Sequence, residues 1–256
     1  MNILFIGDIV GPPGCDMVRR TLPKLKARYD ISLVVANGEN ASAGNGLLPK
    51  TANFLFNSGV DVLTLGNHAF RRREIYDYLD EQPHIIRPLN YPKGVHGRGF
   101  CIYDMGAVRI AVVNLIGQVY LSPNGDPFEA ADCVLKQIDT PNILVDFHAE
   151  ATGEKGAMAY YLAGRVSAVL GTHTHVQTAD GRILKEKTGF ISDVGMTGPY
   201  DSILGVCPSA VVQGVTTHLP TRFRVEDGPC HMQMVLLKLE TKTGVCQEIT
   251  ALQMVD

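Results

Sequence analysis

The sequence lacks several features that would assign it to a specialised class of protein. Its six cysteines are scattered, and none of them forms a CxxC pair. A chain of 256 residues can bury a substantial core without a disulfide framework, so we expect reduced cysteines that mainly pack. No apolar run has the length of a membrane span, and the first one, Ile3-Leu4-Phe5-Ile6, follows no basic leader. We therefore expect a cytoplasmic protein with no membrane partner.

A dominant charge of one sign is also absent. The chain has 23 basic and 26 acidic residues, a formal net charge of -3. Proteins that bind long nucleic acids usually carry a clustered basic face. The run Arg71-Arg72-Arg73 is interpreted as the solvated start of a surface helix, because such charge runs are most often solvated. We expect no long DNA or RNA partner.

Alternation of apolar runs with helix-compatible stretches predicts an α/β fold. Strand-like runs at 2–7, 31–37 and 60–66 alternate with helical stretches at about 16–29, 49–58 and 71–82. This order predicts parallel strands joined by crossover helices. Further along, we predict a hairpin over 99–114, a strand-helix-strand unit over 143–171, β-rich structure after Gly181 and a hairpin over 231–252. Since no linker, repeat or low-complexity tract divides the chain, we predict one domain over residues 1–256.

Five of the apolar runs end at a residue that can bind a metal ion. These residues are Asp8 after 3–6, Glu39 and Asn40 after 33–36, Asn67 and His68 after 62–65, His148 after 143–145, and His173 and His175 after 168–170. In an open α/β sheet, ligands bind outside the carboxyl ends of the strands, so distant side chains can converge there. The recurrence predicts one multi-metal centre.

Each cluster also has an ordinary interpretation when it is considered alone. His173 and His175 are two polar loop histidines, and Asn67 suits the cap of a helix over 71–82. Glu39 and Asn40 form a polar turn, although a carboxylate has two oxygens and can bridge two cations. The repetition of ligand-type residues at strand ends favours the metal site over these separate explanations.

The motifs together closely resemble the calcineurin-like metallophosphoesterase superfamily, and in particular its bacterial YmdB-like branch of phosphodiesterases. The resemblance covers nearly the whole chain, through Gly7-Asp8, Asn37-Gly38-Glu39-Asn40, Gly66-Asn67-His68, the segments 146–152 and 171–180, and Asp193-Val194-Gly195-Met196-Thr197-Gly198-Pro199. The superfamily usually has Asp-x-His after its first strand, whereas Asp8 is followed by Ile9 and Val10. Its usual bridging Asp is replaced by Glu39. The branch shares both departures.

The resemblance implies a layered α/β/β/α sandwich with mixed sheets and two divalent or mixed-valence metal ions per chain. One metal would be held by Asp8, Glu39, Asn40 and His175, and the other by Glu39, Asn67, His148 and His173. Mixed oxygen and nitrogen donors favour iron or manganese and leave zinc, cobalt and magnesium open. The flanking carboxylates Asp146, Glu150, Asp180 and Asp193 are candidates for orienting these ligands.

The activity implied by the resemblance is hydrolysis of a phosphodiester, with 2′,3′-cyclic or 3′,5′-cyclic nucleotides as the leading substrates. A metal-bridging hydroxide would attack the phosphorus, and His68 is assigned as the general acid. Two alternatives stay open: a phosphomonoesterase or nucleotidase, and a metal-stabilised nucleotide-binding regulatory protein with little turnover. The glycine-containing segments 43–46 and 195–199 either shape the rim of the site or simply turn the chain. The resemblance and the commonness of symmetric assembly also suggest a homo-oligomer.

Overall fold

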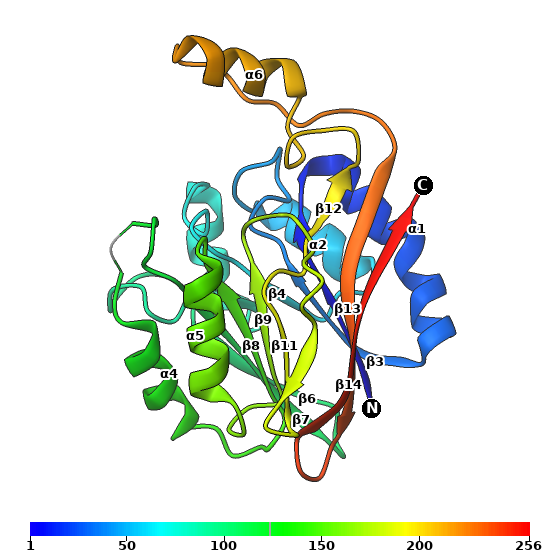
Figure 1. The fold of residues 1–256 in the computed structure, drawn as a ribbon, viewed down its shortest axis with the longest axis vertical. Helices are drawn as coiled ribbons and strands as arrows, with labels where there is room; N and C mark the ends of the chain where they lie inside the picture. The colour runs from blue at the N-terminus through cyan, green and yellow to red at the C-terminus, as the bar shows by residue number, and fades with distance from the viewer. Residues whose placement is uncertain (123) are drawn as a thin grey trace.

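Two mixed β-sheets pack face to face, and helices cover the outer face of each sheet (Figure 1). The structure, a computed structural model, describes residues 1–122 and 124–256. Within this part of the chain the layers follow the order helix, sheet, sheet, helix. The predicted α/β/β/α sandwich with mixed sheets is therefore confirmed, while the assignment of one domain over 1–256 stays a prediction.

The first sheet combines parallel strands from the amino-terminal half with strands from the carboxyl-terminal end. Strands β1, β3, β4 and β5 run parallel, and β13 lies antiparallel to β1 and pairs with the final strand β14. A short branch of β12 and β2 continues the sheet beyond β13. The bounds are β1 (Asn2–Ile6), β2 (Asp8–Ile9), β3 (Ile31–Asn37), β4 (Val62–Thr64), β5 (Ile85–Ile86), β12 (Met196–Pro199), β13 (Cys230–Glu240) and β14 (Val245–Val255).

The second sheet has the strand order β10-β11-β9-β8-β7-β6. Its central strands β7, β8, β9 and β11 are parallel, and each edge strand is antiparallel to its neighbour. The bounds are β6 (Phe100–Asp104), β7 (Arg109–Ile116), β8 (Ile143–His148), β9 (Ala168–Thr172), β10 (Arg182–Leu184) and β11 (Thr188–Ile191). The predicted hairpins over 99–114 and 231–252 are both confirmed.

Strand β1 shows how one strand contributes to two of the three hydrophobic cores. Successive side chains of a strand point to opposite faces of the sheet. Ile3 and Phe5 accordingly pack between the sheets, and Leu4 and Ile6 pack under the helices. The helices of the first sheet are α1 (Gly11–Tyr29), α2 (Pro49–Asn57) and α3 (Tyr76–Glu81), and those of the second are α4 (Pro127–Leu135) and α5 (Thr152–Leu162). Burial of both faces explains why the strands read as continuous apolar runs.

Several local predictions differ from the structure in the bounds or the type of the element. Helix α1 begins at Gly11, because Pro12 and Pro13 occupy its first turn, where no backbone N–H donor is needed. The predicted helix over 71–82 is a 3₁₀ turn, η1 (Arg73–Ile75), followed by α3. The segment 195–199, expected at a rim or turn, contains the buried strand β12.

The region after Gly181 also contains helix α6 (Pro208–Thr217), which the β-rich prediction missed. This helix buries none of its residues, and Figure 1 shows it projecting away from both sheets. Across the described residues, no helix combines the length and apolar character needed to span a bilayer.

Candidate metal centre

All eight residues predicted for the site lie at one edge of the sandwich, where strands of both sheets end. Strands β1, β3 and β4 of the first sheet lead to Asp8, to Glu39 and Asn40, and to Asn67 and His68. Strands β8 and β9 of the second sheet lead to His148, and to His173 and His175. Convergence of strand ends from the two sheets therefore brings together residues from five segments of the chain.

The carboxylate of Glu39 lies at the centre of one group of ligand atoms. Its Oε1 is 3.2 Å from Nε2 of His148, which is itself 2.9 Å from Oδ1 of Asn67 and 3.1 Å from Nδ1 of His173. One ligand atom each from Glu39, His148 and His173 lies within 4.8 Å of the other two, an arrangement suited to a metal ion.

Asp8, Asn40 and His175 form a second group on the other side of Glu39. Oδ1 of Asp8 is 3.7 Å from Nε2 of His175, and Nδ2 of Asn40 is 3.2 Å from the same nitrogen and 3.5 Å from Oε1 of Glu39. The Oδ1 atom of Asp8 is buried and has no hydrogen-bond partner among the described residues. A buried carboxylate oxygen without a partner is costly, and a cation would satisfy it.

The charges of the two carboxylates are unevenly balanced. Burial would raise the pKa of Glu39, but the adjacent His148 and His68 outweigh burial and lower that pKa to about 2. Burial raises the pKa of Asp8, although His175 and His148 act in the opposite direction. Without metal ions, the neighbouring histidines therefore favour the ionised form of Glu39, whereas burial favours the neutral form of Asp8. The donor set of carboxylates, amides and imidazoles fits divalent cations that accept both oxygen and nitrogen.

A buried chain of hydrogen bonds orients His148 through Nδ1, the ring nitrogen that is not the predicted ligand atom. Oγ1 of Thr172 donates to Oδ1 of Asp146 at 2.7 Å and lies 2.9 Å from Nδ1 of His148. Because the hydroxyl proton is directed to Asp146, the hydroxyl oxygen accepts from Nδ1–H of His148, which leaves Nε2 as the ligand atom. Asp146 was a candidate for this kind of role. Thr172 was missed, because a threonine next to a predicted histidine ligand carries no distinguishing sequence signal.

The loop of His173 and His175 has a strained backbone that a buried carboxylate holds in place. The two residues have φ angles of 102° and 63°, which are uncommon for side chains other than glycine. Between them, Thr174 donates from its backbone nitrogen and its hydroxyl to Oδ2 of Asp193, at 3.1 and 2.7 Å. Lys155 donates to the same oxygen at 2.7 Å. Asp193 therefore fixes this loop, whereas Asp180 bonds to Thr178 and Ser192, away from the ligand atoms.

His68 lies at the edge of the cluster, with its backbone nitrogen donating to Oε2 of Glu39 at 2.9 Å. Its Nδ1 is 2.7 Å from Oδ1 of Asn40, so Nε2 is left for other contacts. The alternative of Asn67 as a helix cap is wrong: Arg72 caps η1 without a side-chain bond, and Oδ1 of Asn67 lies at His148. A cavity of about 340 Å³ opens over His68, Glu39, Asn40, His173 and His175.

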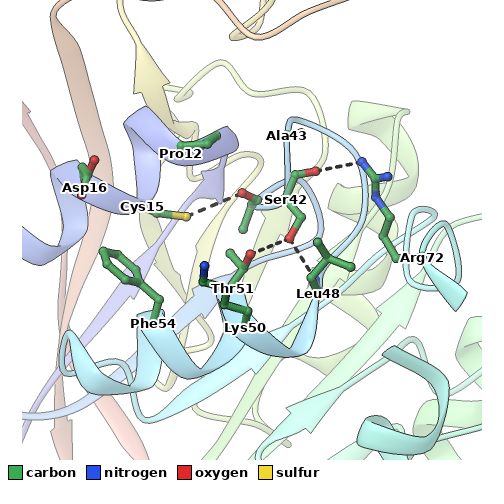
Figure 2. A pocket seen from close by; sticks show the side chains of 11 residues that line it. Pro12, Cys15, Asp16, Ser42, Ala43, Leu48, Lys50, Thr51, Phe54 and Arg72 are labelled. Carbon is green, nitrogen blue, oxygen red and sulfur yellow. Dashed lines mark hydrogen bonds between the residues drawn. The ribbon is translucent and has the colours of Figure 1, made fainter. Parts of the chain in front are cut away.

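The loop that follows Asn40 also lines a second cavity of about 520 Å³, shown in Figure 2. Ser42 accepts from the backbone nitrogen of Leu48 at 2.9 Å and donates to Thr51 at 2.8 Å. Arg72 donates to the carbonyl oxygens of Ser42 and Asn45 at 3.3 and 2.9 Å. These hydrogen bonds hold the loop in place. Arg72 therefore supports the backbone next to Asn40. The segment 43–46 lines the site cavity with Ala43, Gly44 and Asn45, which makes it part of the rim.

The sequence model of the YmdB-like protein family matches residues 4–252. This chain belongs to the YmdB-like protein family. It is 47% identical over 245 residues to the 2′,3′-cyclic-nucleotide 2′-phosphodiesterase of Bacillus subtilis (strain 168), an alignment that covers 95% of this chain and 93% of that protein.

Solved structures agree with this assignment. A hypothetical protein from Thermus thermophilus superimposes with a TM-score of 0.95 at 41% identity, with both chains fully covered. A novel phosphatase from Mycoplasma pneumoniae gives a TM-score of 0.94 at 30% identity, covering 100% of this chain and 93% of that one. The calcineurin-like phosphoesterase YfkN from Bacillus subtilis, at 12% identity and a TM-score of 0.55, shares the fold. The predicted family, fold and class of phosphoester hydrolase are confirmed, and the individual ligand assignments stay predictions.

Proposed function

We propose that this YmdB-like protein is a dinuclear metal-dependent phosphodiesterase that hydrolyses cyclic nucleotides. The observation that carries the proposal is the position of Glu39 between two groups of ligand atoms, one of which contains the unpartnered oxygen of Asp8. Asp8, Glu39, Asn40 and His175 would hold one metal, and Glu39, Asn67, His148 and His173 the other. When bound, two ions of iron or manganese would activate water and stabilise charge on the phosphate.

The 2′,3′-cyclic nucleotides are the substrates that we favour. The Bacillus subtilis relative is named for that activity, and it shares nearly half of its aligned residues with this chain. His68 is the general acid in this proposal, because its Nδ1 is engaged by Asn40 while the residue lines the cavity. Its Nε2 would hold the proton that the departing sugar oxygen receives.

Replacing His68 with alanine tests this role. We expect hydrolysis of 2′,3′-cyclic AMP to fall by about 10²–10⁴-fold, the usual contribution of a general acid, while the metal content stays unchanged. Hydrolysis of bis-p-nitrophenyl phosphate should fall much less, because p-nitrophenolate is a good leaving group and needs little protonation. Both rates and the metal content are measured after reconstitution with manganese or iron.

The control is His96→Ala, which removes an imidazole that bonds to Asp80 and does not line the site cavity. Loss of metal from His68→Ala would contradict the general-acid role and would make His68 a ligand or a structural residue. A wild-type enzyme that cleaves p-nitrophenyl phosphate faster than the diesters would instead support a monoesterase. Full metal occupancy without any hydrolysis would support the regulatory alternative.

Removal of the metals should affect stability as well as activity. Without cations, the buried oxygen of Asp8 has no partner among the described residues, so the apoprotein carries an uncompensated carboxylate. We expect chelation to abolish hydrolysis and to lower the melting temperature, and re-addition of metal to restore both, since ligands of the native state stabilise it by mass action. Calorimetry of the apo and reloaded protein checks this. An unchanged melting temperature would contradict a metal at Asp8.

A further inference from the structure

The segment between β12 and β13, residues 200–229, forms an arm that includes α6 (Figure 1). The base of the arm is a short antiparallel ladder. Val206 pairs with Val225, the backbone nitrogen of Cys207 donates to the carbonyl of Arg224 at 3.0 Å, and that of Glu226 donates to Gly205 at 3.0 Å. The arm is therefore anchored at its base while α6 extends from it.

The base of the arm forms one wall of the site cavity. The carbonyl oxygen of Leu204 lies 3.1 Å from Nδ1 of His175, a contact that links the arm to a predicted metal ligand. Val225 approaches the loop after Asn40 so closely that a β-carbon added at Gly44 would be 2.7 Å from Cγ2 of Val225. The arm contributes Leu204, Val206, Phe223, Arg224 and Val225 to the cavity that contains His68.

Phe223 is the feature of this wall that the chemistry described so far does not use. Its side chain is 58% exposed, and it lines both the site cavity and a surface hollow beside α6. Cε1 of its ring is 3.6 Å from the position that a β-carbon at Gly214 would occupy, so the ring leans on α6. It pairs with no other aromatic ring among the described residues. An exposed ring held at a polar catalytic cavity is a ready surface for an apolar, flat ligand group.

We propose that Phe223 is the stacking platform for the nucleobase of the substrate. The inference rests on the proposed function, because it concerns the part of a cyclic nucleotide that lies beyond the metal-bound phosphate. Bases stack on aromatic side chains with little sequence preference, since every base has a π-face. The adjacent Arg224 adds a positive charge to the same wall, which favours an anionic substrate. Helix α6 then supports Phe223 from the side away from the site.

The larger cavity in Figure 2 is less suited to a base. None of the predicted metal ligands lines it, and its aromatic residue, Phe54, packs against the first core. The guanidinium of Arg19 also lies over the ring of Phe54, 5.7 Å from its centroid. Phe54 therefore already has partners on its ring, whereas the ring of Phe223 borders the cavity that holds His68.

Steady-state kinetics on two cyclic diesters test the proposal. One is 2′,3′-cyclic AMP, and the other is glycerol 1,2-cyclic phosphate, which has the same five-membered diester but no base. We expect Phe223→Ala to lower kcat/KM for cyclic AMP about tenfold, mainly through a higher KM, because a stacked base contributes about that much. The rate on glycerol 1,2-cyclic phosphate should be unchanged. Phe223→Tyr, which keeps the π-face, should retain wild-type kinetics on both substrates.

The matched control is Tyr200→Ala, since Tyr200 is an aromatic residue of the same arm with a similar exposure of 57% and does not line the site cavity. It should leave both substrates unaffected. An equal loss on both substrates in Phe223→Ala would overturn the proposal by showing a structural role, and so would unchanged kinetics on cyclic AMP. If the metal-loaded wild type cleaves neither diester, the proposed function itself falls; cleavage of the base-free diester keeps it standing whatever happens at Phe223.

Discussion

Replacing Gly66 with alanine will reduce phosphodiester hydrolysis below the level left in His68→Ala. Gly66 precedes Asn67, and a β-carbon at this position would overlap the imidazole of His148 and lie 2.5 Å from Oε2 of Glu39. Removal of a general acid costs about 10²–10⁴-fold and leaves the metals in place. The added methyl group would instead displace the predicted bridging ligand together with a ligand of the second metal, so both metal sites would be disturbed.

Metal content and hydrolysis of bis-p-nitrophenyl phosphate measure this effect. The control is Gly156→Ala in the middle of α5, where a β-carbon would meet nothing within 4 Å. That substitution should leave activity intact and raise stability by about 0.5–1 kcal/mol, because alanine favours the helix more than glycine does. Full activity in Gly66→Ala would show that hydrolysis does not depend on the positions of Glu39 and His148. That result would exclude the proposed metal centre.

The sequence was informative about the site because the ligand residues sit at fixed places relative to apolar strands. Asp8, Glu39, His148 and His175 could each be located from the run that precedes them, and the structure places them at one edge. The supporting contacts carry no such pattern. The carbonyl oxygen of Leu204 contacts His175 although the two residues are 29 positions apart. The local sequence of neither residue predicts that contact.

The fold was predictable where local periodicity decides it. Strands β1, β3, β8 and β9 are buried on both faces and were recognised as apolar runs, whereas their pairing depends on contacts between distant segments. Strand β13 pairs with β1 although the two strands lie near opposite ends of the chain, which no local pattern specifies. Helix α6 was missed for a different reason: Val, Thr and Gly dominate 211–217, and these residues have low helix propensity.

Replacing Lys155 with methionine will destabilise the fold strongly, although Lys155 touches none of the predicted metal ligands in the described hydrogen-bond network. Its side chain is 2% exposed and its ammonium lies 2.7 Å from Oδ2 of Asp193, which is 1% exposed. Removing one partner of a buried ion pair leaves the other charge without compensation and costs about 3–5 kcal/mol. We expect this loss in the free energy of unfolding measured by urea denaturation.

A double substitution separates the charge from the packing of the methionine. In Lys155→Met with Asp193→Asn, the buried negative charge is gone, so part of the lost stability should return. The control pair is Arg165 and Asp132, whose side chains are 40% and 38% exposed, so breaking it should change the stability very little. Asp193 also accepts two hydrogen bonds from Thr174, between His173 and His175. The single variant should therefore bind metal more weakly as well, and a destabilised variant with unchanged metal affinity would show that the ion pair supports the fold without positioning the loop.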